Sequence, residues 1–243
     1  TAQPAMVTLR GSAYERGRTH GETLRDSFQK LSVKWKADLA ANVGRDSDEF
    51  IAAFLRDTDF LPAIRKWTPD LLDEVRGIAE GAGIPFETAL AMQLLDELWF
   101  YAAEHRDSNH CSTIGIPGTR GRPTYVAQNM DLEKFRDGHQ AVLRIVPESG
   151  APEQLVFTCA GMIALNGVNQ EGLAVVVNTL AELKSSRTGL PVAFVIRGLL
   201  ARGSETEALQ FLTTVPHASG QNYIIGSKRS VHDFEASAGK VVR

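Results

Sequence analysis

The spacing of apolar residues divides the chain into a helical first part and a strand-rich second part. After a short strand-like run at 5–10, apolar positions across 13–104 recur at the spacing of helices. From residue 111 onward the period shortens to brief apolar runs separated by turn residues. We therefore expect a helical segment over 1–110 and a strand-rich segment over 111–243.

Several helix start signals lie in the first part. Asp46 is a capping residue with Glu49 three positions later, and Thr68 is a capping hydroxyl followed by a proline and an acid. Glycines ending at Gly83 stop the helix that Thr68 begins. Pro85 opens a further helix, with apolar positions at Phe86, Ala89, Leu90, Leu94, Leu98 and Trp99. These signals predict helices that start near residues 47, 69 and 86.

The second part predicts an order of strands, helices and strands. Strand-like runs lie at 111–116, 123–130, 140–147, 153–159, 162–166, 172–178, 221–227 and 231–236, with helical stretches at 190–202 and 204–213. The run 173–177 is apolar on both faces, which is typical of a strand between two layers. Helices before and after strands predict an α+β fold with sheet packed on sheet and helices outside.

Size and charge narrow the class of protein. With 243 residues and 43% hydrophobic content, the chain can bury a full core, and a single domain over 1–243 is the simplest count. The 26 basic and 29 acidic residues leave a formal charge of −3, which argues against nucleic acid or an anionic membrane as a partner. No window approaches the roughly 18 consecutive apolar residues of a membrane span.

The two cysteines differ in their surroundings. Cys159 lies in the apolar run 156–160 and fits a small buried hydrophobe. Cys111 stands at the head of a predicted strand, directly after the helical part. If the chain is cut before it, its own α-amino group, with a pKa of about 8, can act as the base for the thiol. Two cysteines make no disulfide framework, so we expect a reducing compartment, the cytoplasm. We expect neither a cofactor nor a metal.

Three stretches of sequence together resemble a known family. Residues 11–21 follow the pattern G-x-x-Y-E-x-G-x-x-H-G, Cys111 is followed 20 residues later by Asp131, and 167–173 leads to Asn178. In this order and spacing they are similar to the isopenicillin N acyltransferase-like family of autoproteolytic cysteine acyltransferases and hydrolases. That family belongs to the N-terminal nucleophile hydrolases, which include penicillin V acylase and bile salt hydrolase.

The resemblance implies an αββα sandwich made as a precursor and cut before the nucleophilic cysteine. Here the cut would fall between His110 and Cys111. Acylase relatives carry an arginine three residues before the aspartate. This chain has Gln128 at that position, and the penicillin acyltransferases resemble it in this respect. The family's usual C-terminal part has no counterpart before Arg243, and 241–242 begins another strand-like run. We therefore expect that part to be absent here and the natural protein to continue past Arg243.

The resemblance also implies roles for three polar residues. Asp131 would hold the released amine, Asn178 would donate to an oxyanion, and Asn222 would be the second asparagine of the site. From the residues alone, each has a structural alternative. Asp131 could cap a turn, Asn178 could end a strand, and Asn222 could begin one. Tyr14, with Glu15, His20 and Gly21 around it, is expected to organise the first helix rather than to act in catalysis.

Two other kinds of site are open on the residues alone. His105 and His110, with Asp107 between them, could be read as a metal site, although their spacing matches no known ligand set. Cys111 could instead pair with His139 in the manner of papain.

The leading functional hypothesis is an amide-bond hydrolase or acyltransferase that works through a thioester on Cys111. The expected substrate is an N-acyl amino-acid-like or β-lactam-related amide, with an acyl-coenzyme A donor as a further partner and with the cut segments staying associated. Its pocket would be formed by loops such as 132–139 and 179–189. The alternative is a binding or assembly module that keeps the fold without catalysis.

Overall fold

The computed structural model describes residues 3–102 and 111–243. Its first part is strand β1 (Ala5–Gly11) followed by helices. These helices are α1 (Ala13–Thr23), α2 (Arg25–Val43), α3 (Ser47–Asp57), α4 (Leu61–Trp67), α5 (Pro69–Ala82), α6 (Phe86–Gln93) and α7 (Leu95–Ala102). The predicted change from helices to strands at residue 111 is therefore confirmed.

The second part is strand-rich with two helices. Its strands are β2 (Ser112–Ile116), β3 (Tyr125–Asn129), β4 (Gln140–Pro147), β5 (Gln154–Cys159), β6 (Asn166–Asn169), β7 (Ala174–Thr179), β8 (Gln221–Gly226), β9 (Val231–Ala236) and β10 (Val241–Val242). The short helix η1 (Lys134–Arg136) follows β3, while α8 (Val192–Leu200) and α9 (Glu205–Thr214) lie between β7 and β8. None of the helices in the described residues is long and apolar enough to cross a membrane.

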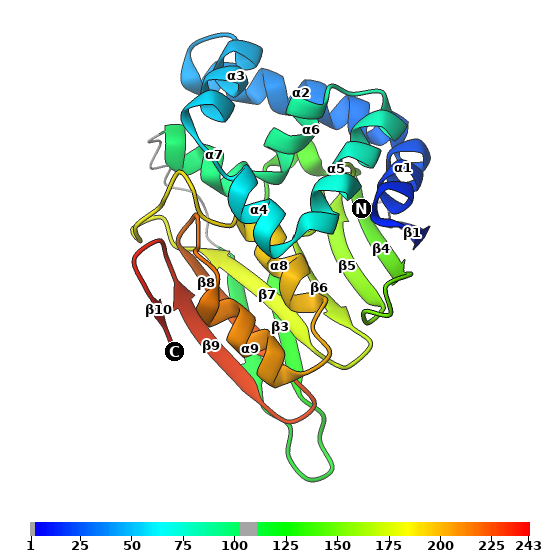
Figure 1. The fold of residues 1–243 in the computed structure, drawn as a ribbon, viewed down its shortest axis with the longest axis vertical. Coiled ribbons are helices and arrows are strands. Elements are labelled where there is room, and N and C mark those ends of the chain that lie inside the picture. Colours follow the sequence, from blue (N-terminus) through cyan, green and yellow to red (C-terminus); the bar gives the residue numbers. More distant parts are fainter. Residues whose placement is uncertain (1–2, 103–110) are drawn as a thin grey trace.

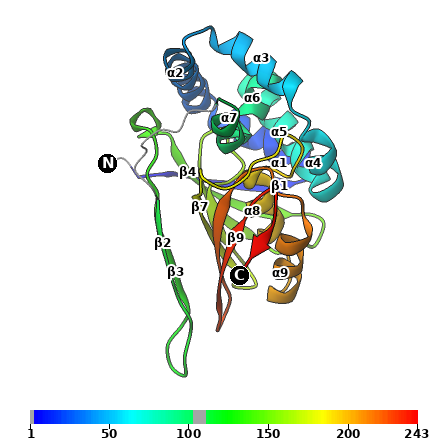
Figure 2. The same ribbon diagram turned by 90° about the vertical axis from the view of Figure 1, so that its left-hand side faces the viewer.

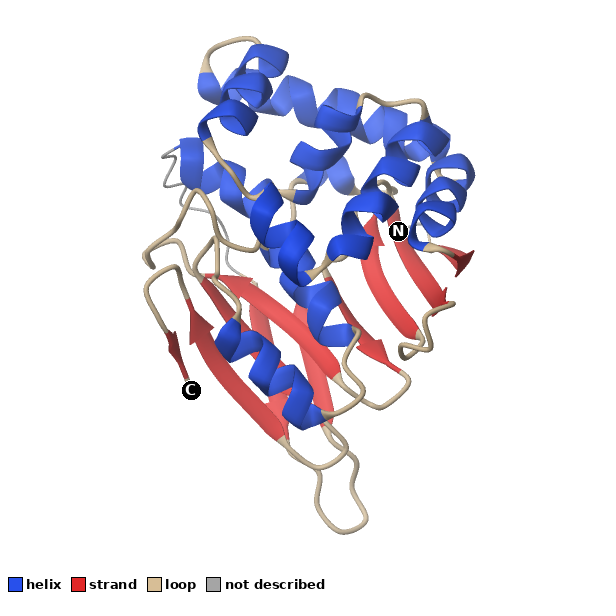
Figure 3. Ribbon diagram, viewed as in Figure 1, coloured by secondary structure: helices blue, strands red, loops and turns tan. Residues whose placement is uncertain are grey.

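Within the described residues, one sheet has the strand order β1-β4-β5-β6-β7-β8-β9-β10, and β2 and β3 form a separate antiparallel hairpin. β1 runs parallel to β4, and every other neighbour in the sheet is antiparallel. Helices α1–α7 gather at one end of the molecule, while α8 and α9 lie against one face of the sheet (Figures 1 and 3). The hairpin lies across the opposite face, where it contacts β7 and β8 (Figure 2). The fold is therefore α+β.

Two glycines allow the hairpin to approach the sheet closely. A Cβ at Gly115 in β2 would lie 2.4 Å from a methyl carbon of Val231, and one at Gly226 in β8 would lie 2.3 Å from a methyl carbon of Val126. Real Cβ atoms do not approach other atoms so closely, so side chains here would push the hairpin away. This packing fixes the start of β2, and with it Cys111, over the large sheet.

The motif at 11–21 is structural, as expected. Ser12 and Glu15 form a reciprocal capping box at the start of α1. His20 is buried, and its Nε2 accepts a hydrogen bond of 3.0 Å from the backbone N–H of Gly161, in the turn after β5. Burial lowers the pKa of His20 to about 4, so the ring is neutral and ties α1 to the sheet.

The sequence located most elements but misplaced three features. Asp46 caps α3 as predicted, with its Oδ1 accepting from two backbone N–H groups. Thr68 does precede α5, but its hydroxyl donates back to the carbonyl of Ile64 rather than capping. The helix opened by Pro85 is broken at Leu94 (φ −110°, ψ 33°), which separates α6 from α7.

The predicted strand at 162–166 is also wrong. Gly161 adopts φ +85° and turns the chain, and the backbone N–H of Ile163 donates to Oε1 of Gln93 at 2.8 Å. Because a glutamine side chain on α6 takes the place of a neighbouring strand, the segment stays irregular and β6 starts only at Asn166.

Candidate active site

The hairpin brings Cys111 and Asp131 together. β2 and β3 pair so that Ser112 lies opposite Asn129, which places the residue before β2 beside the residues after β3. The Sγ of Cys111 lies 4.0 Å from the backbone carbonyl oxygen of Asp131, to which it donates. The carboxylate of Asp131 accepts a long hydrogen bond of 3.5 Å from Nδ2 of Asn129. The Cys111 thiol thus lies beside the backbone of Asp131 at the paired ends of the hairpin.

The Cys111 thiol is half-buried and needs a base. Burial raises its pKa, and the negative charges of Asp131 and Asp96 raise it further, against the lowering effect of its hydrogen bond to the Asp131 carbonyl. At neutral pH the group is therefore S–H rather than thiolate. A nucleophilic role requires a proton acceptor close by.

Asn178 and Asn222 are opposite each other in the ladder between β7 and β8. Nδ2 of Asn178 donates to Oγ1 of Thr113 at 2.9 Å and to Oδ1 of Asn222 at 3.5 Å. Asn222 itself donates to the carboxylate of Asp233 on β9. Oδ1 of Asn178 is buried without a hydrogen-bond partner in the described part of the chain. Asn178 therefore reaches the hairpin two residues beyond Cys111.

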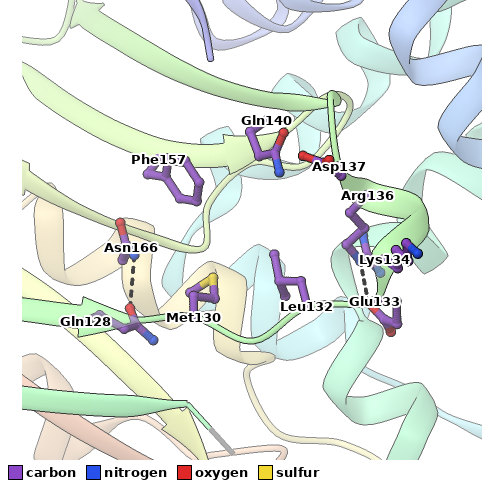
Figure 4. Close-up of a pocket in the computed structure, with 10 residues that line it drawn as sticks. All are labelled: Gln128, Met130, Leu132, Glu133, Lys134, Arg136, Asp137, Gln140, Phe157 and Asn166. Carbon is purple, nitrogen blue, oxygen red and sulfur yellow. Dashed lines mark hydrogen bonds and ion pairs between the residues drawn. The ribbon is translucent and has the colours of Figure 1, made fainter. Parts of the chain in front are cut away.

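Gln128 joins the hairpin to the sheet. Its Nε2 donates to the carbonyl of Val177 at 2.6 Å, and its Oε1 accepts from Nδ2 of Asn166 at 2.9 Å. Figure 4 shows the Gln128–Asn166 bond at one side of a cavity. With both ends of its amide in use, Gln128 fixes the position of β3 relative to β6 and β7.

A cavity of about 430 Å³ lies beside the segment that carries Asp131. Its lining residues are Gln128, Met130, Leu132, Glu133, Lys134, Arg136, Asp137, Gln140, Phe157 and Asn166 (Figure 4). Met130 and Leu132, which flank Asp131, and Phe157 on β5 are its apolar side chains. Loop 132–139, which was expected to form part of the substrate pocket, lines this cavity, whereas none of these lining residues comes from loop 179–189.

Arg136 was not singled out from the sequence, although it lines this cavity. Its side chain is 1% exposed, and its Nε donates to Oε2 of Glu133 at 2.6 Å. Nη2 has no hydrogen-bond partner among the described residues. Nη1 of Arg136 reaches Sδ of Met162 at 3.6 Å, 26 residues further along the chain. The sequence around a three-residue helix carries no signal for such a distant contact.

The structure does not bring His139 to Cys111. Nδ1 of His139 is 2.9 Å from Oγ of Ser27, and Nε2 is 3.1 Å from Nζ of Lys34, both on α2. Both ring nitrogens are therefore engaged away from the thiol, and the papain-like pair has no geometric support.

Two further expectations concern residues outside the described part. His105, Asp107 and His110 all lie there, so the metal hypothesis and the His110 side of the cleavage site stay predictions. Within residues 3–102 and 111–243, no group of three or more potential ligands could hold a metal ion.

Comparison with known proteins defines the class. Residues 119–243 match the family model of acyl-coenzyme A:6-aminopenicillanic acid acyl-transferase, so this chain belongs to that family. The chain is 24% identical over 233 residues to the 40 kDa form of acyl-coenzyme A:6-aminopenicillanic-acid-acyltransferase from Emericella nidulans. The match covers 95% of the chain and 63% of that relative, so the chain spans about 63% of the relative's length. The resemblance inferred from the three motifs is confirmed.

Proposed function

We propose that the protein is an acyltransferase or amide hydrolase of the N-terminal nucleophile class, which works through a thioester on Cys111. The observation that carries this proposal is the placement of the Cys111 thiol beside Asp131, at the end of the sheet where Asn178 reaches the hairpin. The order of helices, large sheet and hairpin supports an αββα sandwich, of which these would be the first three layers.

Maturation would begin at the bond between His110 and Cys111. Sγ attacks the carbonyl carbon of His110, the C–N bond breaks, and the thiol proton passes to the released nitrogen. Water then hydrolyses the thioester, which leaves a carboxylate on His110 and regenerates the Cys111 thiol. The new α-amino group supplies the base that the uncharged thiol needs. Segments 1–110 and 111–243 would remain associated through their shared core.

The same groups would then act on substrate. The α-amine of Cys111 takes the thiol proton as Sγ attacks the acyl carbonyl, and Asp131 holds that amine in place. Nδ2 of Asn178 donates to the developing oxyanion, an interaction worth about 3–4 kcal/mol in such sites, and Asn222 supports it from β8. The leaving group departs with the proton. Attack of water on the thioester then gives hydrolysis, and attack of an acceptor amine gives acyl transfer.

The cavity beside Asp131 supports a small amide or acyl-coenzyme A substrate. Its volume is within the range of ligand pockets, and Met130, Leu132 and Phe157 provide apolar surface for an acyl chain. An N-acyl amino-acid-like or β-lactam-related amide fits this description. The name of the Emericella nidulans relative includes an acyl-coenzyme A donor and 6-aminopenicillanic acid, which favours the same substrates here.

Denaturing gel electrophoresis of the full-length protein tests the proposal. We expect freshly purified wild type to run as two pieces, with the second starting at Cys111 by mass spectrometry, and Cys111→Ala to stay whole and lose turnover. Cys159→Ala is the matched control, since this buried thiol belongs to the core, and it should be cut and active.

Uncut wild type that turns over N-acyl amino acids or acyl-coenzyme A would contradict maturation by cutting. If the cut wild type turns over neither N-acyl amino acids nor acyl-coenzyme A, the proposal of an enzyme is contradicted and a binding module is favoured.

A further inference from the structure

Asp96, near the start of α7, connects the helical part to the ends of two strands in the site. Its Oδ2 accepts hydrogen bonds from Oγ1 of Thr179 at 2.7 Å and from Nε2 of Gln221 at 2.6 Å. Thr179 and Gln221 are opposite each other in the ladder between β7 and β8. The next pair in that ladder is Asn178 and Asn222. One carboxylate oxygen of Asp96 therefore holds β7 and β8 together at the ladder pair next to Asn178 and Asn222.

Glu97 anchors the same turn of α7. Its Oε1 accepts from the backbone N–H of Val192 at 3.0 Å and from Oγ of Ser219 at 2.7 Å. Nε2 of Gln221 also reaches Oγ of Ser219 at 3.2 Å, which joins the two acids in one network. Because Glu97 is buried and its Oε1 accepts from two separate segments, α7 cannot shift without breaking these contacts. Asp96 is therefore held against the strand ends.

Asp96 also lies close enough to the thiol to act on it by charge. The groups that face Asp96 are Glu97 on its own helix, Glu133 and Arg136 around η1, Tyr223 on β8, and Cys111. Burial holds the pKa of Asp96 above its ordinary value, although the hydrogen bonds from Thr179 and Gln221 act to lower it. In turn the negative charge of Asp96 adds to that of Asp131 in raising the pKa of Cys111.

We propose that Asp96 is a positioning residue of the Cys111 site. By clamping the ends of β7 and β8 it fixes where Asn178 meets the hairpin, and its negative charge keeps the Sγ–H bond intact until the α-amine takes the proton. This inference rests on the proposed function. It assigns part of the site to the segment before the cut, because Asp96 precedes Cys111 whereas Thr179 and Gln221 follow it.

The direct test is the pH dependence of Cys111 alkylation by iodoacetamide, followed by mass spectrometry at each cysteine. Asp96→Asn keeps the shape of the side chain and removes its charge, so the midpoint for Cys111 should fall by about half to one pH unit. Asp73→Asn is the control, because it removes an exposed carboxylate on α5 and should leave the midpoint unchanged.

A second variant separates position from charge. Thr179→Val removes one of the two hydrogen bonds to Asp96 but leaves the carboxylate in place. With 6-aminopenicillanic acid and hexanoyl-coenzyme A as probes, we expect kcat to fall about tenfold while KM changes less than about twofold. The alkylation midpoint should stay at the wild-type value.

The outcomes distinguish this inference from the proposed function. If wild-type Cys111 is no more reactive than Cys159 and the protein is inactive, the proposed function fails. If wild type is active but Asp96→Asn keeps the wild-type midpoint, or Thr179→Val keeps the wild-type kcat, the role of Asp96 is overturned. Thermal unfolding of each variant identifies loss of folding, and a folded Thr179→Val still decides the matter if Asp96→Asn does not fold.

Discussion

At the scale of single residues, the site combines polar groups that would be unfavourable if each stood alone. Burial holds the Cys111 thiol uncharged, and a neighbouring acid, Glu97, has its pKa raised to about 7 by burial and by the charge of Asp96. Oε2 of Glu97 is buried without a partner among the described residues. Such groups cost stability and persist where a precise arrangement is needed.

Glu97→Gln tests this cost through the pH dependence of stability. A carboxyl whose pKa is higher in the folded than in the unfolded state binds its proton more tightly when folded. The free energy of unfolding should therefore fall as pH rises from about 4.5 to about 7, the window set by the raised pKa of Glu97. Glutamine can still accept from Val192 and Ser219, so the variant should lose this slope and be more stable at pH 8 by roughly 1–3 kcal/mol.

Urea denaturation at pH 5, 6, 7 and 8 provides the measurement. Glu22→Gln, on the exposed face of α1, is the control and should follow the wild-type slope. An unchanged slope in Glu97→Gln would show that this carboxyl is not the group that titrates.

At the scale of elements, α1 and α5 cross at a contact made of glycines. A Cβ at Gly17 would lie 1.9 Å from the carbonyl oxygen of Glu74, and one at Gly77 would lie 2.2 Å from the carbonyl oxygen of Tyr14. One turn further along, a Cβ at Gly21 or Gly81 would also lie within 2.4 Å of a backbone carbonyl oxygen of the other helix. The glycines of the 11–21 motif are thus explained by backbone packing, and α1 in turn places His20 against Gly161.

Gly77→Ala should therefore destabilise the fold. Alanine favours a helix over glycine by about 1 kcal/mol, but the added methyl would overlap backbone atoms that cannot move aside without separating α1 from α5. Because the overlap is with backbone, its cost should reach the upper end of the range for overpacking, about 3 kcal/mol, so the net loss should be about 2 kcal/mol. Gly203→Ala is the matched control, since its Cβ meets only the end of the flexible Glu207 side chain at 3.5 Å. Equal stability of the two variants in urea would contradict close packing at the crossing.

At the scale of the whole molecule, a buried ion network connects the helical segment to the strand-rich one. Glu74 on α5 is fully buried and forms ion pairs with both Arg197 on α8 and Arg16 on α1. Although burial acts to raise it, these guanidinium groups hold the pKa of Glu74 below its ordinary value. Arg197 also donates to Gln154 on β5 and to the carbonyl of Ile163. If the chain is cut before Cys111, this network joins the two pieces.

Glu74→Gln should weaken that association strongly. The substitution leaves two buried guanidinium groups without a counter-charge, which costs about 3–5 kcal/mol, whereas Glu22→Gln breaks an exposed pair with Arg18 and should cost less than about 1 kcal/mol. Urea unfolding gives the difference in the free energy of unfolding between the two variants. Gel filtration in urea shows whether the two pieces separate at a lower urea concentration. If Glu74→Gln lowers the free energy of unfolding no more than Glu22→Gln does, the ion network is not what holds the two pieces together.

Elements with local signals could be predicted from the amino-acid sequence. Periodicity and caps predicted α3, α5, most strands and the change at residue 111, because hydrogen bonds and apolar faces within a few residues set these features. The ordered motifs indicated the family. The predicted strand runs 111–116 and 123–130 do pair as one antiparallel hairpin, and this pairing brings Cys111 beside Asp131. The roles of Cys111, Asp131, Asn178 and Asn222 stay predictions.

Features that depend on contacts between distant segments could not be predicted and are visible only in the folded chain. Gln93 on α6 satisfies the backbone near 163 and so removes a predicted strand, and the break at Leu94 separates α7 from α6. Neither Asp96 nor Arg136 was singled out from the sequence, because their contacts include residues more than 20 positions away. Those partners become neighbours only when the helical segment, the sheet and the hairpin pack together.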